Sequence, residues 1–444
     1  MNEELLTRVI DGALAKGAAD AEAVATWGSE FDVDVANGEV ETLALAESGG
    51  IGLRVFTSDR RLGFAYSTRG EEGIDALIAS AWDNACANDP DPANLLPGEA
   101  GESDDDWSEQ DFRGVPVADK VALAKGLEQA ALAADSRMKS VQEAAYGDID
   151  YQVVIANSMG LMRRFRNSFC ICSVTGVAES HGDQEMAGEF DFARSFESLR
   201  WEWVAGRCAS RAAQRLGGKP CASKTAPVVL DNQTAASFLR VLGNTLNANS
   251  VLKGKSLFAG RLGETVAAGV VSLVDQNDYA QGMYRAPFDG EGVSAQATPL
   301  IENGVLRNYM HNVYSAARMD ARSTANAGRG GGYRSTPEIS ATSCFMAPGE
   351  HAPEALWEGI EDGFYVTDVM GVHTANPISG DFSIGASGLA IANGKLGGPI
   401  RGVTVAGNLT EFLRNIDAVG SDLRFLGTYG APSARVSQMV ISGT

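Results

Sequence analysis

Apolar residues recur along the first hundred positions with two periods, one helical and one typical of β-strands. Residues 5–14 place their apolar side chains at helical spacing, and residues 74–82 repeat this pattern, so both segments are predicted to be amphipathic helices. Between them, residues 31–35, 51–55 and 62–66 alternate apolar with polar side chains. Because a two-residue period is typical of half-buried strands, this part of the chain predicts an antiparallel sheet with flanking helices.

The next hundred residues continue the same mixture of helices and strands. An alanine-rich helix is predicted over residues 117–134, strand-like segments lie between residues 139 and 177, and a long helix is predicted from about 193 to 216. Two glycines and a proline follow directly and end that helix at Gly217, Gly218 and Pro220. We therefore expect a domain boundary near residue 220.

Beyond this boundary the chain consists mainly of short apolar runs separated by glycine-rich turns. Two of these turns are Asn-Gly pairs, at residues 303–304 and 393–394, and such pairs favour two-residue hairpins. The predicted fold class is therefore α+β. A mixed α/β N-terminal domain (residues 1–220), with an antiparallel sheet and flanking helices, precedes a β-rich C-terminal domain (residues 221–444).

The charge of the chain narrows the classes of partner. A net charge of −21 repels nucleic acid and anionic membrane surfaces, and the acidic tract over residues 88–112 is expected to form an exposed loop. The N-terminus is acidic where a signal peptide needs positive charge, and no stretch approaches the ~18 apolar residues of a membrane span. We expect a cytoplasmic protein that binds neither nucleic acid nor membranes.

Residues that bind metals are sparse in this chain. The four histidines, His181, His311, His351 and His373, lie far apart, and none belongs to an H-E-x-x-H-like cluster. The six cysteines have no paired spacing. We therefore expect no metal and no cofactor, and structural or exposed positions for the histidines, with His373 of most interest because it lies at the start of a dense motif.

This motif spans residues 371–388 and is followed by the Asn-Gly hairpin. Its glycines allow close approach of neighbouring backbones, and its short polar side chains can bond an adjacent main chain. A sheet with such open edges can dock an extended peptide by strand addition, although a purely structural run of turns remains an open alternative. The candidate peptide-binding residues are His373, Asn376, Ser379, Asp381, Ser383, Asn393 and Gly394.

Several motifs resemble those of the TldD/PmbA family, also called the modulator of DNA gyrase family. They occur in the family's order along nearly the whole chain: GIGLRVF at 50–56, DGEG at 289–292, LIENG at 300–304, NPISGDF at 376–382 and PIRGVTVAGN at 399–408. The resemblance implies a mixed α/β N-terminal part and a β-rich C-terminal part. It also implies an assembly of two related subunits that encloses a cavity where peptides are cut.

In this family the TldD-type subunit carries an H-E-x-x-x-H motif on a helix that holds zinc, and a later cysteine is also implicated. The corresponding helix here is residues 233–247, with Arg240 and Thr245 at the histidine positions and Val241 at the glutamate position. None of these side chains can replace an imidazole or a general base. Residues 426–432 also lack the cysteine. The resemblance is therefore to the TldE/PmbA-like branch.

The leading hypothesis is a non-catalytic subunit of a TldD/TldE-type metallopeptidase assembly that processes modified or unfolded peptides. Its expected partners are a TldD-like zinc-bearing subunit, with which it forms a heterodimer, and extended peptide substrates, and the isolated chain can form a homodimer. One alternative is a stand-alone hydrolase that uses His373 with Asp381 or a nearby serine. Another is a homodimeric peptide-binding module without a protease partner.

Overall fold

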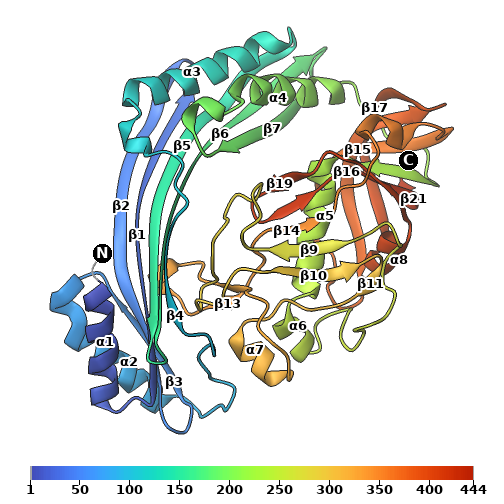
Figure 1. Cartoon of the computed structure of the whole chain (residues 1–444). Helices are drawn as coiled ribbons and strands as arrows, with labels where there is room; N and C mark the ends of the chain where they lie inside the picture. Colours follow the sequence, from blue (N-terminus) through green and yellow to red (C-terminus); the bar gives the residue numbers. More distant parts are fainter. Residues whose placement is uncertain (1–2, 444) are drawn as a thin grey trace.

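The computed structural model describes residues 3–443 and divides the chain into an elongated N-terminal half and a C-terminal half packed beside it (Figure 1). The N-terminal half contains four α-helices and seven strands: α1 (Glu3–Lys16), β1 (Asp20–Ala36), β2 (Glu39–Phe56), β3 (Leu62–Ser67), α2 (Ile74–Ala87), β4 (Gly101–Asp106), α3 (Val117–Ala134), β5 (Met138–Asn157), β6 (Leu161–Ser180), β7 (Asp183–Ala193) and α4 (Trp201–Arg215). The helices predicted at residues 5–14, 74–82 and 117–134 are confirmed.

The seven strands form one sheet in the order β3-β2-β1-β5-β6-β4, with β7 also paired to β6. All four helices cover the same face of this sheet. On β1, Ala21, Ala23 and Ala25 lie beneath α1 and α2, whereas Phe31 and Val33 lie beneath α3. Because side chains alternate between faces with a period of two, these odd-numbered positions share one face, and the two helix pairs stand at opposite ends of it (Figure 1).

Two predicted segments of this half differ from the structure. The expected exposed loop over residues 88–112 contains β4, which pairs in parallel with the arginine-rich start of β6. Its acidic side chains stabilise this pairing, since Arg164 lies 3.3 Å from Asp104. The helix expected from about residue 193 begins only at Trp201, because β7 extends to Ala193 and a turn separates the two elements.

The C-terminal half contains two mixed sheets with α5 between them. Its elements are β8 (Lys224–Leu230), α5 (Asn232–Thr245), α6 (Ala248–Leu252), β9 (Leu273–Gln276), β10 (Ala297–Glu302), β11 (Val305–Leu306), α7 (Val313–Arg318), β12 (Ala327–Gly328), β13 (Glu338–Ile339), β14 (Cys344–Met346), β15 (Asp362–Met370), β16 (Asp381–Ala392), β17 (Lys395–Asn408), α8 (Leu409–Arg414), β18 (Ile416–Val419), β19 (Arg424–Leu426), β20 (Tyr429–Ala431) and β21 (Ala434–Ser442). The sheets have the orders β11-β10-β9-β14-β20-β19 and β17-β16-β15-β8-β21-β18. One large apolar core joins α5 to both sheets, and the predicted α+β class is confirmed.

Both predicted Asn-Gly hairpins are present. Asn303 and Gly304 have φ angles of 46° and 81°, and Asn393 and Gly394 have φ angles of 48° and 72°. Positive φ at both central residues is the signature of a type I′ turn, which connects twisted antiparallel strands without splaying them. These turns fix the register of β10 with β11 and of β16 with β17.

Across residues 3–443, none of the helices has the length and apolar character needed to cross a membrane.

Candidate functional site

A buried group of charged side chains connects the two halves of the chain. The Arg54 guanidinium on β2 donates from Nε and Nη2 to both carboxylate oxygens of Glu22 on β1, at 2.9 and 2.6 Å. It also donates from Nη1 to Glu291 of the C-terminal half, at 3.3 Å. Arg329 approaches Glu22 from the C-terminal half as a second cation. These side chains are at most 7% exposed, so each charge depends on its partners to offset the cost of losing water.

The turn that carries Glu291 is organised by the carboxylate of Asp289. One Asp289 oxygen accepts the backbone N–H groups of Glu291 and Val293, at 2.9 and 3.0 Å, and the other accepts the N–H of Ala327 at 3.0 Å. Glu291 in turn accepts the N–H of Val313, at the first residue of α7, at 2.8 Å. Burial raises the pKa of both carboxyl groups, and the proximity of Glu291 raises that of Asp289 further.

A glycine-rich segment brings Arg329 into this group. Tyr333 lies so close to β2 that a Cβ atom at Gly50 would stand 2.3 Å from the tyrosine ring, and one at Gly52 would stand 2.2 Å from the tyrosine backbone oxygen. Both positions therefore require glycine. The segment is docked on the sheet, and burial lowers the pKa of Arg329 to about 10.

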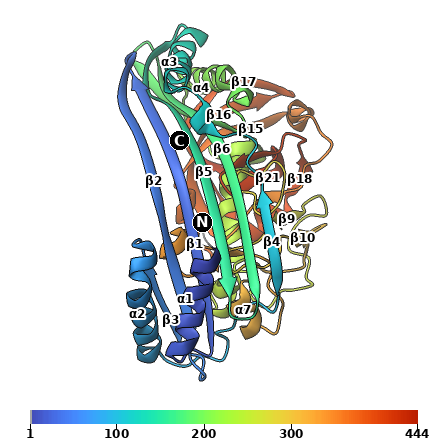
Figure 2. The ribbon, with the colours of Figure 1, turned by 60° about the vertical axis from the view of Figure 1, so that its left-hand side comes forward.

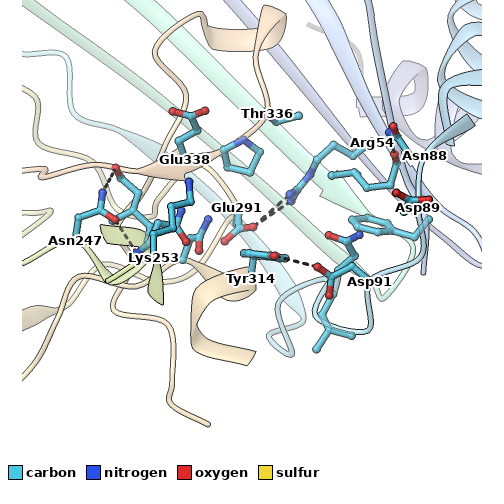
Figure 3. A pocket seen from close by; sticks show the side chains of 18 of the residues that line it. Arg54, Asn88, Asp89, Asp91, Asn247, Lys253, Glu291, Tyr314, Thr336 and Glu338 are labelled. Atoms are coloured by element: carbon cyan, nitrogen blue, oxygen red, sulfur yellow. Dashed lines mark hydrogen bonds and ion pairs between the residues drawn. The ribbon is translucent and has the colours of Figure 1, made fainter. Parts of the chain in front are cut away.

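A cleft of about 830 Å³ lies beside this group, between the two halves. Figure 3 shows Asn247, Lys253 and Glu338 on one side, Asn88, Asp89 and Asp91 on the other, and the Arg54–Glu291 pair between them. Tyr314 donates its hydroxyl to Asp91 at 2.9 Å. The remaining lining residues are mainly polar and include Asn94, Asn249, Ser250, Lys255, Asn312 and Thr336.

The charged side chains at the rim of this cleft are available to a ligand. In the described part of the chain, no ion pair or hydrogen bond involves the side chains of Lys253, Lys255, Asp89 or Glu338. Cations and anions therefore face the same space, and the cleft can hold a polar chain that carries both kinds of charge. Sequence reasoning did not find this site, although two of its segments, residues 50–56 and 289–292, belong to the motifs that carry the family resemblance.

The helix at the degenerate metal positions is confirmed as α5, but its side chains do not fit a zinc ion. Arg240 is exposed, Val241 is partly buried, and Thr245 is fully buried and donates its hydroxyl to the Leu242 carbonyl at 2.6 Å. A guanidinium and a buried hydroxyl that is already bonded to the backbone are not zinc ligands, and valine offers no base. Among residues 3–443, no three His, Cys, Asp or Glu side chains gather closely enough to hold a metal ion.

The candidate peptide-binding residues divide between two places. Asn376 accepts the backbone N–H groups of Ile378 and Ser379, at 2.9 and 3.1 Å, and so closes a tight turn. Asn408 donates to the Ser379 carbonyl at 2.8 Å and to Asp381 at 2.9 Å. The polar side chains of NPISGD thus stabilise the entry into β16.

The hairpin candidates lie apart from that turn. Asn393 and Gly394 are at the far end of β16, roughly 35 Å away at the usual rise per residue. His373 is exposed, and within residues 3–443 it has no hydrogen bond to Asp381, Ser379 or Ser383. The seven residues therefore do not form one compact site, and their role in binding peptides stays a prediction.

The remaining histidines have structural surroundings. His181 occupies a turn between β6 and β7 with a φ angle of 52°. His311 is buried, with its Nδ1 atom 3.2 Å from the Ser315 hydroxyl, and desolvation lowers the pKa of its imidazole to about 4. His351 is exposed and forms an isolated bridge with Gly420.

Three family models cover most of this fold. They are described as PmbA/TldA metallopeptidase domain 1, central domain and C-terminal domain, and they match residues 21–85, 110–216 and 223–443. The chain therefore belongs to the PmbA/TldD/TldE metallopeptidase family. The recognition made from its motifs is confirmed.

Individual relatives match over almost the full length. The metalloprotease PmbA of Escherichia coli O157:H7 is 27% identical over 99% of this chain and 96% of its own. The crystal structure of a putative modulator of a DNA gyrase from Thermotoga maritima has a TM-score of 0.89 and 26% identity, and the match covers 99% of this chain and 100% of that one. TldE from Thermococcus kodakarensis has the same fold, with a TM-score of 0.89 at 21% identity, covering 99% and 100% of the two chains.

Proposed function

We propose that this chain is a non-catalytic subunit of a TldD/TldE-type metallopeptidase assembly that processes modified or unfolded peptides. In this assembly it forms a heterodimer with a related zinc-bearing subunit. The observation that carries the proposal is the composition of α5, where an exposed arginine, a valine and a buried threonine stand at the positions of the metal-binding motif. A guanidinium stays protonated at neutral pH and cannot ligate zinc, and valine offers no base to activate water.

The interdomain cleft supports a role in holding peptides. Its volume of about 830 Å³ is within the range of ligand sites in proteins, and its unpaired lysines and carboxylates can bind acidic and basic groups of an extended peptide. Such binding contributes to proteolysis by positioning the substrate, without a nucleophile or metal from this chain.

The stand-alone hydrolase has less support, because its proposed base, His373, has no hydrogen bond to Asp381 or to a neighbouring serine in the described structure. A homodimeric peptide-binding module would bind peptides in the same cleft as the subunit of the leading proposal. Only the presence of a catalytic partner distinguishes these two functions.

Reconstitution tests the proposal. This chain, a related chain from the same genome that carries H-E-x-x-x-H, and their mixture would be assayed on an unfolded peptide. We expect peptidase activity in the mixture, co-migration of the two chains on gel filtration, and no activity from this chain alone. Strong activity of this chain alone, or a catalytic chain that neither binds it nor gains activity from it, would contradict the proposal.

The double variant K253E/K255E tests the role of the cleft in the same mixture. Charge reversal should raise KM for an acidic peptide several-fold and leave kcat nearly unchanged, because the lysines bind substrate away from the reacting bond. Lys139→Glu is the matched control, since this exposed lysine lies on β5 outside the cleft. Equal effects of both variants would exclude a specific role for the cleft.

A further inference from the structure

The outer part of β2 is an unpaired sheet edge. β3 pairs with β2 only from Ile51 to Phe56, and no strand in the described structure pairs with the outer side of residues 39–48. All ten of these residues are exposed, and Figure 2 shows this stretch of β2 along the free margin of the sheet. A long row of free backbone N–H and C=O groups is a template for pairing with another strand.

This edge is ordered by contacts on its inner side. It pairs continuously with β1, and the turn that precedes it is tied to α3, where the Glu128 carboxylate accepts the backbone N–H of Gly38 at 2.9 Å. A strand that docks here would therefore meet a preorganised partner, which lowers the entropic cost of association.

Three apolar side chains of the edge lie next to the apolar core beneath α3 but are exposed to solvent. Each is paired with a residue of β1 that is buried in that core, and paired residues share a face of the sheet. The pairs are Val40 with Val35, Leu43 with Val33 and Leu45 with Phe31. A bulge at Glu41 keeps Val40 on this face. The edge side chains are 37%, 51% and 66% exposed, in the same order.

The acidic side chains of the edge also lack ion-pair partners in the described structure. Glu39, Glu41 and Glu47 surround the apolar residues, and none of them forms an ion pair within residues 3–443. Trp27, which is 37% exposed, lies at the end of this surface beside a hollow of about 450 Å³ that Glu47 also lines. The surface thus combines a free backbone edge, an apolar row and unneutralised acids.

We propose that residues 39–48 are a docking edge for a strand of a different polypeptide chain, apolar in its middle and basic at its ends. Backbone pairing would continue the sheet, apolar side chains would cover the row beside α3, and Lys or Arg residues would neutralise the three glutamates. We identify the partner that supplies this strand as the zinc-bearing subunit, an identification that rests on the function proposed above.

A second copy of this chain fits the edge less well. It would bring the same three glutamates to the interface, and each copy has a net charge of −21. Like charges close together destabilise a contact. The charge of the edge therefore favours a less acidic partner.

Two synthetic peptides test the edge without a natural partner. Both alternate valine and threonine, and one has two lysines at each end where the other has two glutamates. We expect the lysine peptide to slow hydrogen exchange at residues 39–48 and to bind at least about tenfold more tightly at low salt. This preference should shrink at about 0.5 M NaCl. Unchanged exchange at this edge, or equal binding of both peptides, would overturn the proposal.

The double variant L43K/L45K locates the interaction. It should weaken lysine-peptide binding by about tenfold or more, because it removes the apolar row and adds repulsive charge. The fold should persist, since both side chains are exposed, and far-ultraviolet circular dichroism would verify this. Met186→Lys, at a 53% exposed apolar residue on β7 of the same sheet, should leave binding unchanged. An equal loss in both variants would contradict the assignment to β2.

The same variants distinguish this proposal from the proposed function. A zinc-bearing chain that binds the wild type and L43K/L45K equally would refute the docking edge while leaving the heterodimer intact. Binding of the lysine peptide without any pairing to that chain would preserve the edge and refute the heterodimer. A wild-type homodimer in sedimentation that L43K/L45K dissociates would show that a second copy occupies the edge, contrary to the charge argument.

Discussion

The guanidinium of Arg54 lies 3.3 Å from the carboxylate of Glu291 and joins the long N-terminal sheet to the C-terminal half. Arg54 is simultaneously bidentate to Glu22, so one cation fixes two carboxylates from distant parts of the chain. The same pair lies at the cleft between the halves (Figure 3). The orientation of the two halves and the shape of the cleft therefore depend on one buried set of charges.

Removing Arg54 should be strongly destabilising. In Arg54→Ala, Glu22 keeps only Arg329 as a cation and Glu291 loses its direct partner, and breaking a buried ion pair costs about 3–5 kcal/mol. Urea unfolding would measure the loss. Arg8→Ala, which breaks an ion pair whose side chains are 60% and 65% exposed, is the control and should change stability little. Equal losses would mean that Arg54 does not hold the halves together.

The turn before β16 should depend on Asn408. This side chain accepts the N–H of Thr410 at the start of α8 at 3.0 Å, and it donates to Ser379 and Asp381. Asn408→Ala should therefore lower the free energy of unfolding by about 1–2 kcal/mol. Ser383→Ala, at an exposed position whose side chain makes no such bonds within residues 3–443, should cost much less, and a similar cost would show that the NPISGD turn is not stabilised in this way.

The buried imidazole of His311 predicts acid sensitivity. Its folded pKa of about 4 is below the ordinary value of 6.5, so protons bind the unfolded chain more readily. Stability should fall as pH decreases from about 6.5 to 4, by about 2–3 kcal/mol from this group. Unfolding of wild type and His311→Asn across this range isolates the effect, because the variant lacks the titration. Parallel pH profiles would show that His311 is not the source.

His373→Ala discriminates between the hydrolase and subunit hypotheses. The histidine is exposed and has no hydrogen bond to Asp381 or to the nearby serines in the described structure, so its removal should leave the peptidase kcat of the reconstituted mixture within about twofold. A loss of about a hundredfold or more is expected of a general base. Such a loss, with the complex still intact on gel filtration, would favour the hydrolase.

Local periodicity was sufficient to predict much of the fold. The apolar spacing near Leu5 and the Asn-Gly pair at Asn393 determine structure within a few residues, and both predictions are confirmed. The length of β5 was not predictable in the same way, because polar Asp148 interrupts its apolar pattern. That carboxylate is accommodated by Lys120 of α3, 2.5 Å away, and this contact depends on tertiary packing.

The cleft was missed for the same physical reason. From the neighbouring sequence alone, Arg54 is predicted to be a polar residue on an alternating strand, and Glu291 is predicted to be part of a glycine-rich turn. Their shared role appears only when residues 237 positions apart are brought together. The absence of metal ligands on α5 required only the identities of its side chains, so it could be inferred from the sequence.

Zinc analysis of the isolated chain tests the central claim most directly. After expression with added zinc and gel filtration, elemental analysis should find far less than one zinc per chain, because α5 offers Arg240, Val241 and Thr245 in place of ligands and base. One tightly held zinc per chain, retained on dialysis and accompanied by peptidase activity, would contradict the assignment as a non-catalytic subunit.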